Sequence, residues 1–348
     1  MKWVGVLLLS ATISCQHIRE KPCANPQALC DPNALMLFGL VFQPSTRYLL
    51  VLGDSTMTSY QVNPSTGGLT LVNSVGATLS NAHSAVFNPV FSHVYVINQG
   101  GSYVSTYSID TSTGRLAFLQ TASISASGTD AALEPGGRLL FVTTGANGLI
   151  STLRASPSGL SQAAMLNAGT PVSAIAAIPE TQEVYVNEDS SAVLRRYSYD
   201  SNGNLTQSSY TTGCLSTAYA AYSAPFMYLS CAAGQLKSYN GYLLSTVVVG
   251  STPAQIAVAA DGSPVLTATS AFLRLYRSAG GSMTFSASSG LNTTHGGAAI
   301  SLNGAFAWSG RSSGVVEVTP MDGDSFLSFG PDVTASFAPV YMIPINTL

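Results

Sequence analysis

The chain has 348 residues, of which 13 are lysine or arginine and 16 are aspartate or glutamate, so only 8% of it is charged and its formal net charge is −3. This balance excludes a nucleic-acid-binding protein, because phosphate recognition needs a basic face. A hydrophobic share of 46% excludes a disordered chain. Beyond the N-terminus, no apolar run approaches the ~20 residues that a membrane-spanning helix needs.

The N-terminal segment is typical of an export signal. A short positive end is followed by an apolar run from Trp3 to Ile13, and small residues precede Cys15. The residues before Cys15 resemble the lipobox of bacterial lipoproteins, although Thr12 stands where leucine is usual. Ordinary signal-peptidase cleavage is the alternative. We predict a signal peptide over residues 1–14, and a lipidated Cys15 with a polar, proline-containing tether over residues 15–33.

The other four cysteines fall into two pairs that are close in sequence. An even number of cysteines in an exported chain favours disulfides. Of the three possible connectivities we predict the most local one, Cys23 with Cys30 and Cys214 with Cys231. A zinc site is not expected at these cysteines, since no CxxC spacing occurs.

One sequence pattern recurs seven times between residues 34 and 330. Each copy begins with a strand of small residues and continues with a β-branched and aromatic strand, an alternating strand and a short outer strand. The copies begin at residues 38, 83, 129, 173, 216, 255 and 297. A repeat of this length with four strands per unit is typical of a β-propeller. We therefore predict an all-β fold, a seven-bladed β-propeller with four-stranded antiparallel blades.

The tail, residues 331–348, fits the pattern less well. Phe337-Ala-Pro339 echoes the Phe-x-Pro that ends the first strand of other copies. One interpretation is a strand that helps to close the ring against the first blade. All seven copies already contain four predicted strands, so the pairing of the tail stays open.

The second copy carries a recognisable motif. Residues 94–98 read Val-Tyr-Val-Ile-Asn, and residues 107–116 read Tyr-Ser-Ile-Asp-Thr-Ser-Thr-Gly-Arg-Leu. In this order the motif resembles the blades of seven-bladed lactonase-like propellers, which are related to YVTN-repeat propellers. The resemblance implies the propeller fold. It also implies an activity, hydrolysis of a sugar lactone as in the 6-phosphogluconolactonase-like family.

The expected binding face is the one where the innermost strands begin, at the mouth of the central channel. Aligning the copies places one residue of each in a ring there: Phe38, His83, Thr129, Ser173, Ser216, Gln255 and Gly297. Neighbouring loops add polar and charged side chains: Asp54, Asn98, Gln99, Asp130, Glu188, Asp189, His295 and Arg311. We predict eight ligand-binding residues among them: His83, Thr129, Asp130, Ser173, Glu188, Ser216, Gln255 and His295. No metal site and no cofactor is predicted, since the ring offers no converging carboxylates or histidines.

Two functions are compatible with these residues. The preferred hypothesis is a non-catalytic envelope lipoprotein, a monomer anchored to the membrane by its lipid, whose Ser/Thr/Gly-rich faces bind a protein or carbohydrate partner. It rests on the uncharged ring and on the export signal, because phosphorylated sugar lactones are cytoplasmic metabolites. The alternative is a lactone hydrolase with His83 as general base and Arg311 steadying the oxyanion. His83 also fits a channel-lining, hydrogen-bonding role, and Tyr219 is interpreted as packing.

Overall fold

The computed structural model describes most of the chain after residue 45: residues 46–76, 78–145, 147–215, 218–250, 253–259, 262–269, 272–288, 295–323, 325–327 and 332–345. These residues all belong to one of two compact units, Ser45–Leu348, the other being Met1–Pro44. The predicted signal peptide, the lipidated Cys15, the tether, Phe38 and Ser216 lie outside the described residues.

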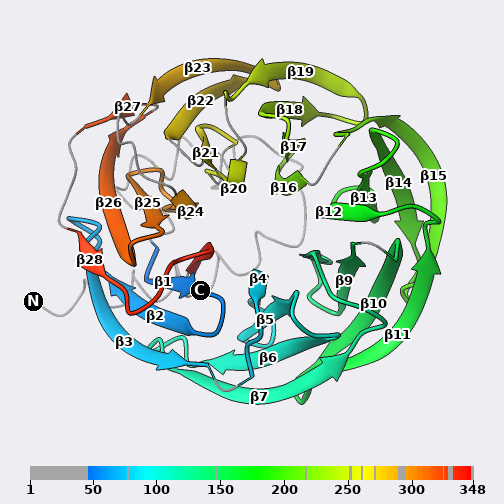
Figure 1. Cartoon of the computed structure of the whole chain (residues 1–348), viewed down its shortest axis with the longest axis horizontal. Helices are drawn as coiled ribbons and strands as arrows, with labels where there is room; N and C mark the ends of the chain where they lie inside the picture. Colours follow the sequence, from blue (N-terminus) through cyan, green and yellow to red (C-terminus); the bar gives the residue numbers. More distant parts are fainter. Residues whose placement is uncertain are drawn as a thin grey trace, which may run out of the picture. The chain divides into compact units, whose positions relative to one another are not determined.

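The described residues form seven antiparallel sheets arranged around a central axis, as predicted for a seven-bladed propeller (Figure 1). The first blade contains β29 (Tyr341–Ile345), β1 (Tyr48–Leu52), β2 (Met57–Val62) and β3 (Leu69–Val75), and the second contains β4 (Ala82–Asn88), β5 (His93–Asn98), β6 (Tyr103–Ile109) and β7 (Leu116–Ser123). The third blade contains β8 (Asp130–Leu133), β9 (Leu139–Thr144), β10 (Leu149–Ser156) and β11 (Gly159–Asn167). The fourth contains β12 (Val172–Ile178), β13 (Glu183–Glu188), β14 (Val193–Tyr199) and β15 (Leu205–Thr212).

The other three blades contain β16 (Ala218–Ser223), β17 (Phe226–Cys231), β18 (Gln235–Tyr239) and β19 (Leu243–Val248); β20 (Pro253–Val258), β21 (Val265–Thr269), β22 (Leu273–Ala279) and β23 (Ser282–Ser288); and β24 (His295–Ile300), β25 (Phe306–Arg311), β26 (Val315–Asp322) and β27 (Ser325–Phe326), with β28 (Val333–Thr334) also paired to β26. Nowhere in the described ranges is there a helix of the length and apolar character that crossing a membrane would require.

The hydrophobic core lies between neighbouring blades. The second strands β5 and β9 are buried along their whole length. Tyr95 and Ile97 of β5 pack in one cluster with Leu140 and Val142 of β9 in the next blade. A strand buried on both faces favours β-branched and aromatic residues, which is why this strand gave the clearest sequence signal.

The C-terminal strand supplies the inner edge of the first blade. β29 pairs with β1, with Tyr341 opposite Leu52. The prediction had used the segment that begins at Phe38 for this position, and the structure corrects it. Joining the two ends of the ring in one sheet covers strand edges that would otherwise be exposed.

Two glycines of β24 make room for this closing segment. A Cβ atom on Gly296 would lie 2.1 Å from the carbonyl oxygen of Pro339, and one on Gly297 would lie 3.1 Å from the backbone nitrogen of Tyr341. Only residues without a side chain allow the backbones to approach so closely.

The predicted disulfide between Cys214 and Cys231 is present, with Cα atoms 5.4 Å apart, whereas Cys23 and Cys30 lie outside the described residues. It joins the connection before β16 to the end of β17. Cross-linking a loop of this length stabilises the folded state by about 3 kcal/mol, chiefly by restricting the unfolded chain.

We expect the double variant Cys214→Ser, Cys231→Ser to lose about 3 kcal/mol of unfolding free energy. Urea unfolding followed by tryptophan fluorescence measures this loss. Wild-type protein treated with a thiol reductant serves as the control and should unfold at the same midpoint as the double variant. An unchanged midpoint in both samples would show that the bridge does not stabilise the fold.

Candidate functional site

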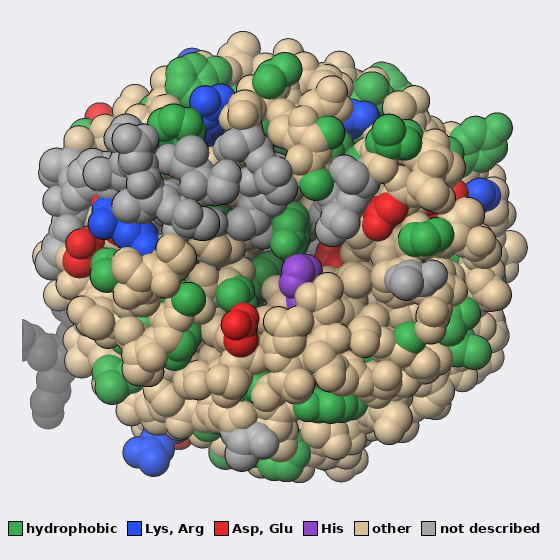
Figure 2. Space-filling view, viewed as in Figure 1, with side chains coloured by type: hydrophobic (Ala, Val, Ile, Leu, Met, Phe, Trp, Pro, Cys, Tyr) green, Lys and Arg blue, Asp and Glu red, His purple; other side chains and the backbone are tan. Residues whose placement is uncertain are grey.

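Backbone pairing defines one level of the channel. When the second strands are aligned, their fourth position is Leu52, Ile97, Thr143, Ser230, Ala268 or Gly310 in six of the blades. Its partner on the inner strand is, in the same order, Tyr341, Ser84, Asp130, Tyr219, Gln255 or Gly297. These six residues therefore occupy equivalent places around the axis. Seen down this axis, the molecule has a central hollow with histidine and acidic side chains at its rim (Figure 2).

This ring differs from the predicted one because several inner strands begin with a bulge. In β4 the register shifts between Ala82 and Ser84, so His83 is an extra residue. Similar shifts occur at the start of β12, β20 and β24. A bulge changes which side chain faces the channel, and sequence alignment alone does not show where the extra residue falls. Gln255 and Gly297 are the two residues that the predicted and observed rings share.

Asp130 is the buried carboxyl group of the channel. It is 8% exposed, and its Oδ1 and Oδ2 accept the N–H groups of Ala131 (2.9 Å) and of Ile175 in the next blade (3.1 Å). Burial penalises the charged form and raises the pKa of Asp130 to about 7, against the lowering effect of these hydrogen bonds. A substantial fraction of Asp130 is therefore protonated at neutral pH.

His83 lies against the ring of Tyr219. The ring centroids are 5.7 Å apart and the ring planes meet at 29°. Burial lowers the pKa of His83 below its ordinary value of 6.5, so the imidazole is neutral at pH 7. Burial, with a smaller contribution from the charge of Asp130, raises the pKa of Tyr219 to about 12, so its phenol keeps its proton. Tyr219 packs against the core cluster that contains Tyr228, as interpreted, and its ring also contacts the channel histidine.

Tyr341 brings a second phenol to the same group. Burial is the main cause that raises its pKa, and the charges of Asp130 and Tyr219 add to it. Sequence analysis did not identify Tyr341, because it lies in the tail and reaches the channel only through the pairing of β29 with β1. The adjacent glycines Gly296 and Gly297 in an inner strand were the one feature of the sequence that could have indicated the close approach of another segment's backbone, here that of Pro339 and Tyr341.

Gln255 holds this tyrosine's strand in place. Its amide oxygen accepts the N–H groups of Ala298 (2.8 Å) and Met342 (3.1 Å), and its amide nitrogen donates to the carbonyl oxygen of Met342 (3.0 Å). The side chain is 3% exposed. Gln255, predicted to bind a ligand, thus connects β20, β24 and β29.

Ser173 and Thr129 lie at the mouth of the channel. The hydroxyl of Ser173 donates to Asp189, which follows β13. Thr129 bonds through its hydroxyl to the backbone and side-chain oxygens of Thr143. Burial raises the pKa of Asp189, against the lowering effect of its bonds with Ser173 and Asn187.

Two further predicted residues are engaged within their own blades. Glu188 accepts hydrogen bonds from Arg195 and Ser191, and Arg311 forms an ion pair with Glu317 (2.8 Å). The guanidinium of Arg311, predicted to steady an oxyanion, is therefore held by a carboxylate. For His295 the structure describes the backbone only. Within the described ranges, no three side chains of the His, Cys, Asp or Glu type gather to form a metal site.

Comparison with known proteins gives a partial family match and a shared fold. Residues 51–171 match the family model described as lactonase, 7-bladed β-propeller, whereas a search of curated proteins found no match. Several solved structures share the propeller fold. One is the periplasmic gluconolactonase of Pseudomonas aeruginosa, with 17% identity and a TM-score of 0.74, covering 85% of this chain and 98% of its own.

Two other similar structures come from Bacteroides and carry the name 6-phosphogluconolactonase as a provisional assignment. The protein from Bacteroides fragilis has 14% identity and a TM-score of 0.73, covering 87% of this chain and 98% of its own. The protein from Bacteroides uniformis has 14% identity and a TM-score of 0.75, covering 86% and 99%. The family match overturns the preferred hypothesis of a non-catalytic scaffold and favours the alternative, a lactone hydrolase.

Proposed function

We propose that this chain is a lactone hydrolase whose active site lies in the propeller channel, with His83 as general base and Asp130 as general acid. One observation carries the proposal. The two groups have pKa values displaced in opposite directions, His83 downward and Asp130 upward to about 7. Near neutral pH, a neutral base and a protonated acid thus coexist in one channel, which is what acid–base catalysis needs.

The reaction follows from these protonation states. His83 takes a proton from water while the water oxygen attacks the lactone carbonyl, and the phenols of Tyr219 and Tyr341 donate hydrogen bonds to the oxyanion that forms. The tetrahedral intermediate then breaks the bond between the carbonyl carbon and the ring oxygen. Asp130 gives its proton to that oxygen, producing the hydroxy acid. A proton passing from His83 to Asp130 through water restores both groups.

The lactone of a sugar acid is the substrate class that the similar structures support, since their names refer to gluconolactone or its phosphate. We also propose that the protein is exported by its N-terminal signal and anchored through Cys15. The disulfide between Cys214 and Cys231 supports an oxidising compartment. The periplasmic gluconolactonase among the similar structures removes the objection that such chemistry belongs only to the cytoplasm.

The pH dependence of kcat/KM tests this assignment. The rate should rise with pH as His83 loses its proton, through a pKa below 6.5, and fall as Asp130 ionises around its pKa of about 7. We expect a narrow bell-shaped profile in initial rates of glucono-δ-lactone hydrolysis, corrected for the uncatalysed reaction. In His83→Gln the acidic limb should disappear and the rate should fall by about 100-fold or more.

His93→Gln is the matched control. His93 is also a buried histidine whose pKa burial lowers, but it lies at the start of β5 and packs against Phe91 and Tyr95. Its substitution should leave the profile in place. Wild-type protein without lactonase activity, or an acidic limb that persists in His83→Gln, would contradict the proposal.

A further inference from the structure

A second carboxyl group lies at the mouth of the same channel. Asp189 follows β13, and its side chain reaches Ser173 at the start of the inner strand β12. Asp130 accepts the N–H of Ile175 on that same strand. The two carboxyl groups thus bond to Ser173 and Ile175 of β12, which lie two residues apart, or roughly 7 Å along the strand. Asp189 is therefore held nearer than Asp130 to the end at which the inner strand β12 begins.

Among the residues that the structure describes, hydrogen bonds reach one oxygen of this carboxyl group. Oδ1 of Asp189 accepts hydrogen bonds from Ser173 and from Nδ2 of Asn187, the latter at 3.0 Å. Oδ2 accepts no hydrogen bond from any residue that the structure describes, and the side chain is partly exposed. A carboxylate oriented by two donors on one oxygen presents the other oxygen in a fixed direction, as an acceptor for a ligand's hydroxyl group.

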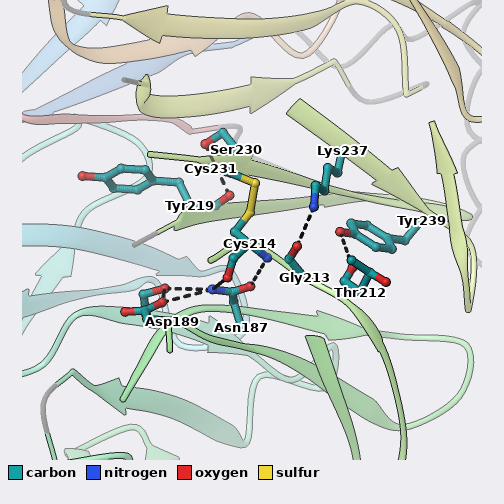
Figure 3. Close-up of a disulfide and its surroundings, with 11 residues drawn as sticks. Asn187, Asp189, Thr212, Gly213, Cys214, Tyr219, Ser230, Cys231, Lys237 and Tyr239 are labelled. Atoms are coloured by element: carbon teal, nitrogen blue, oxygen red, sulfur yellow. Dashed lines mark hydrogen bonds between the residues drawn. A yellow bond between two sulfur atoms is a disulfide. The ribbon is translucent and has the colours of Figure 1, made fainter. Parts of the chain in front are cut away.

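The disulfide fixes the residue that orients Asp189 (Figure 3). Oδ1 of Asn187 accepts the N–H of Cys214 at 2.7 Å, and Nδ2 of Asn187 also donates to the carbonyl oxygen of Cys214 at 3.3 Å. Cys214 is bonded to Cys231. In the segment before Cys214, the carbonyl oxygen of Gly213 accepts a hydrogen bond from the buried Lys237 at 2.5 Å. The asparagine is thus clamped between a cross-linked backbone and the carboxylate.

We propose that Asp189 is a specificity-determining residue, whose free oxygen accepts a hydrogen bond from a substrate hydroxyl group and selects polyhydroxylated lactones over lactones with an unsubstituted ring. This inference rests on the proposed lactonase activity. A hydrogen bond from a hydroxyl group to an ionised carboxylate is short and about twice as strong as a neutral one. A site built to bond a hydroxyl group discriminates strongly against an analogue that lacks it, because the carboxylate then loses its partner.

The test compares glucono-δ-lactone with δ-valerolactone, which has the same ring and no hydroxyl groups. Asp189→Asn keeps an oxygen for Ser173 and Asn187 but turns an amide nitrogen outward. We expect kcat/KM for glucono-δ-lactone to fall about tenfold, the difference between a charged and a neutral hydrogen bond. Asp189→Ala should lower it by up to about 100-fold. Hydrolysis of δ-valerolactone should change less than about twofold in both variants, within the spread of surface substitutions.

Asp200→Asn is the control. Asp200 is an exposed carboxylate that is also held by hydrogen bonds, from Asn202 and Asn204 in the turn after β14. This control should leave both substrates unaffected. Equal losses for the two lactones in the Asp189 variants, or no loss for either, would overturn the inference.

Binding of lactams separates this inference from the proposed activity. Glucono-δ-lactam and δ-valerolactam resist hydrolysis and can be titrated by calorimetry into the wild type and Asp189→Ala. Tighter binding of the hydroxylated lactam that depends on Asp189 supports the inference, even if the wild type hydrolyses neither lactone and the proposed activity fails. If the wild type binds the two lactams equally, or binds neither, the selectivity is not present and the inference is overturned.

Discussion

Asp130→Asn is expected to lower kcat/KM for glucono-δ-lactone by about 100- to 10,000-fold, the range over which a positioned acid or base contributes to catalysis. The asparagine amide has nearly the shape of the carboxyl group and keeps an oxygen for one of the two N–H groups that Asp130 accepts. It cannot release a proton to the ring oxygen of the lactone. The loss should therefore appear in the rate, and the falling limb of the pH profile should disappear with it.

A stability measurement shows that the substitution acts through the same proton. Because burial raises the pKa of Asp130 to about 7, the folded protein binds a proton that the unfolded chain has already released, so this group's contribution to stability falls as pH rises towards 7. Asparagine has no such proton. The Tm of Asp130→Asn relative to the wild type should therefore increase between pH 4 and pH 8.

Asp322→Asn, an exposed carboxylate at the end of β26, is the control for both measurements. It should leave the rate and the pH dependence of the Tm unchanged. A variant Asp130→Asn with wild-type activity would remove Asp130 from the mechanism.

Gln255→Ala is expected to lower the free energy of unfolding by about 4 kcal/mol. The substitution leaves three buried backbone groups of β24 and β29 without their partner, and each such group costs about 1–3 kcal/mol. Two of these three groups belong to Met342 in β29, the strand that closes the ring, so the substitution weakens the attachment of this strand. Tyr341 lies next to Met342 on that strand, so we also expect activity to decrease in the fraction that remains folded. Urea unfolding and the rate per folded molecule measure the two effects.

Gln120→Ala is the matched control for the ring-closing glutamine. Gln120 donates one hydrogen bond, of 2.8 Å, to the carbonyl oxygen of Leu160 in the neighbouring blade. Losing one partly buried bond should cost about 1 kcal/mol. If both glutamine variants lose the same amount, Gln255 is an ordinary contact between blades and does not secure the closure.

The architecture was accessible from the sequence because a blade is a local structure. In six of the seven blades the four strands follow one another along the chain, and the buried second strand, such as Val94–Ile97, has a composition that recurs along the sequence. The disulfide between Cys214 and Cys231 was accessible for the same reason, since the two cysteines lie 17 residues apart. His83, Asp130 and Asp189 could be assigned to one end of the blades from the sequence, because the start of each inner strand could be counted from the repeat.

The site itself depends on contacts between blades. The bulge at His83 changes which residues face the channel, and the pairing pattern that defines it forms only when β4 meets β5. The stacking of Tyr219 against His83 of the second blade was not predicted, because the two residues lie 136 positions apart in the sequence. The raised pKa of Asp130 also depends on the tertiary structure, because it results from burial of a carboxyl group that bonds to Ile175 in the next blade.

The sequence by itself thus determined the number of blades and the order of strands within six of them, because these follow from local patterns of apolar and turn residues. Only the tertiary structure decided that the tail closes the ring and carries Tyr341 into the channel, and that burial lowers the pKa of His83 and raises the pKa of Asp130. Closure joins the two ends of the described unit, and a pKa responds to everything that excludes water around a group. Neither property is encoded in any single copy of the repeat.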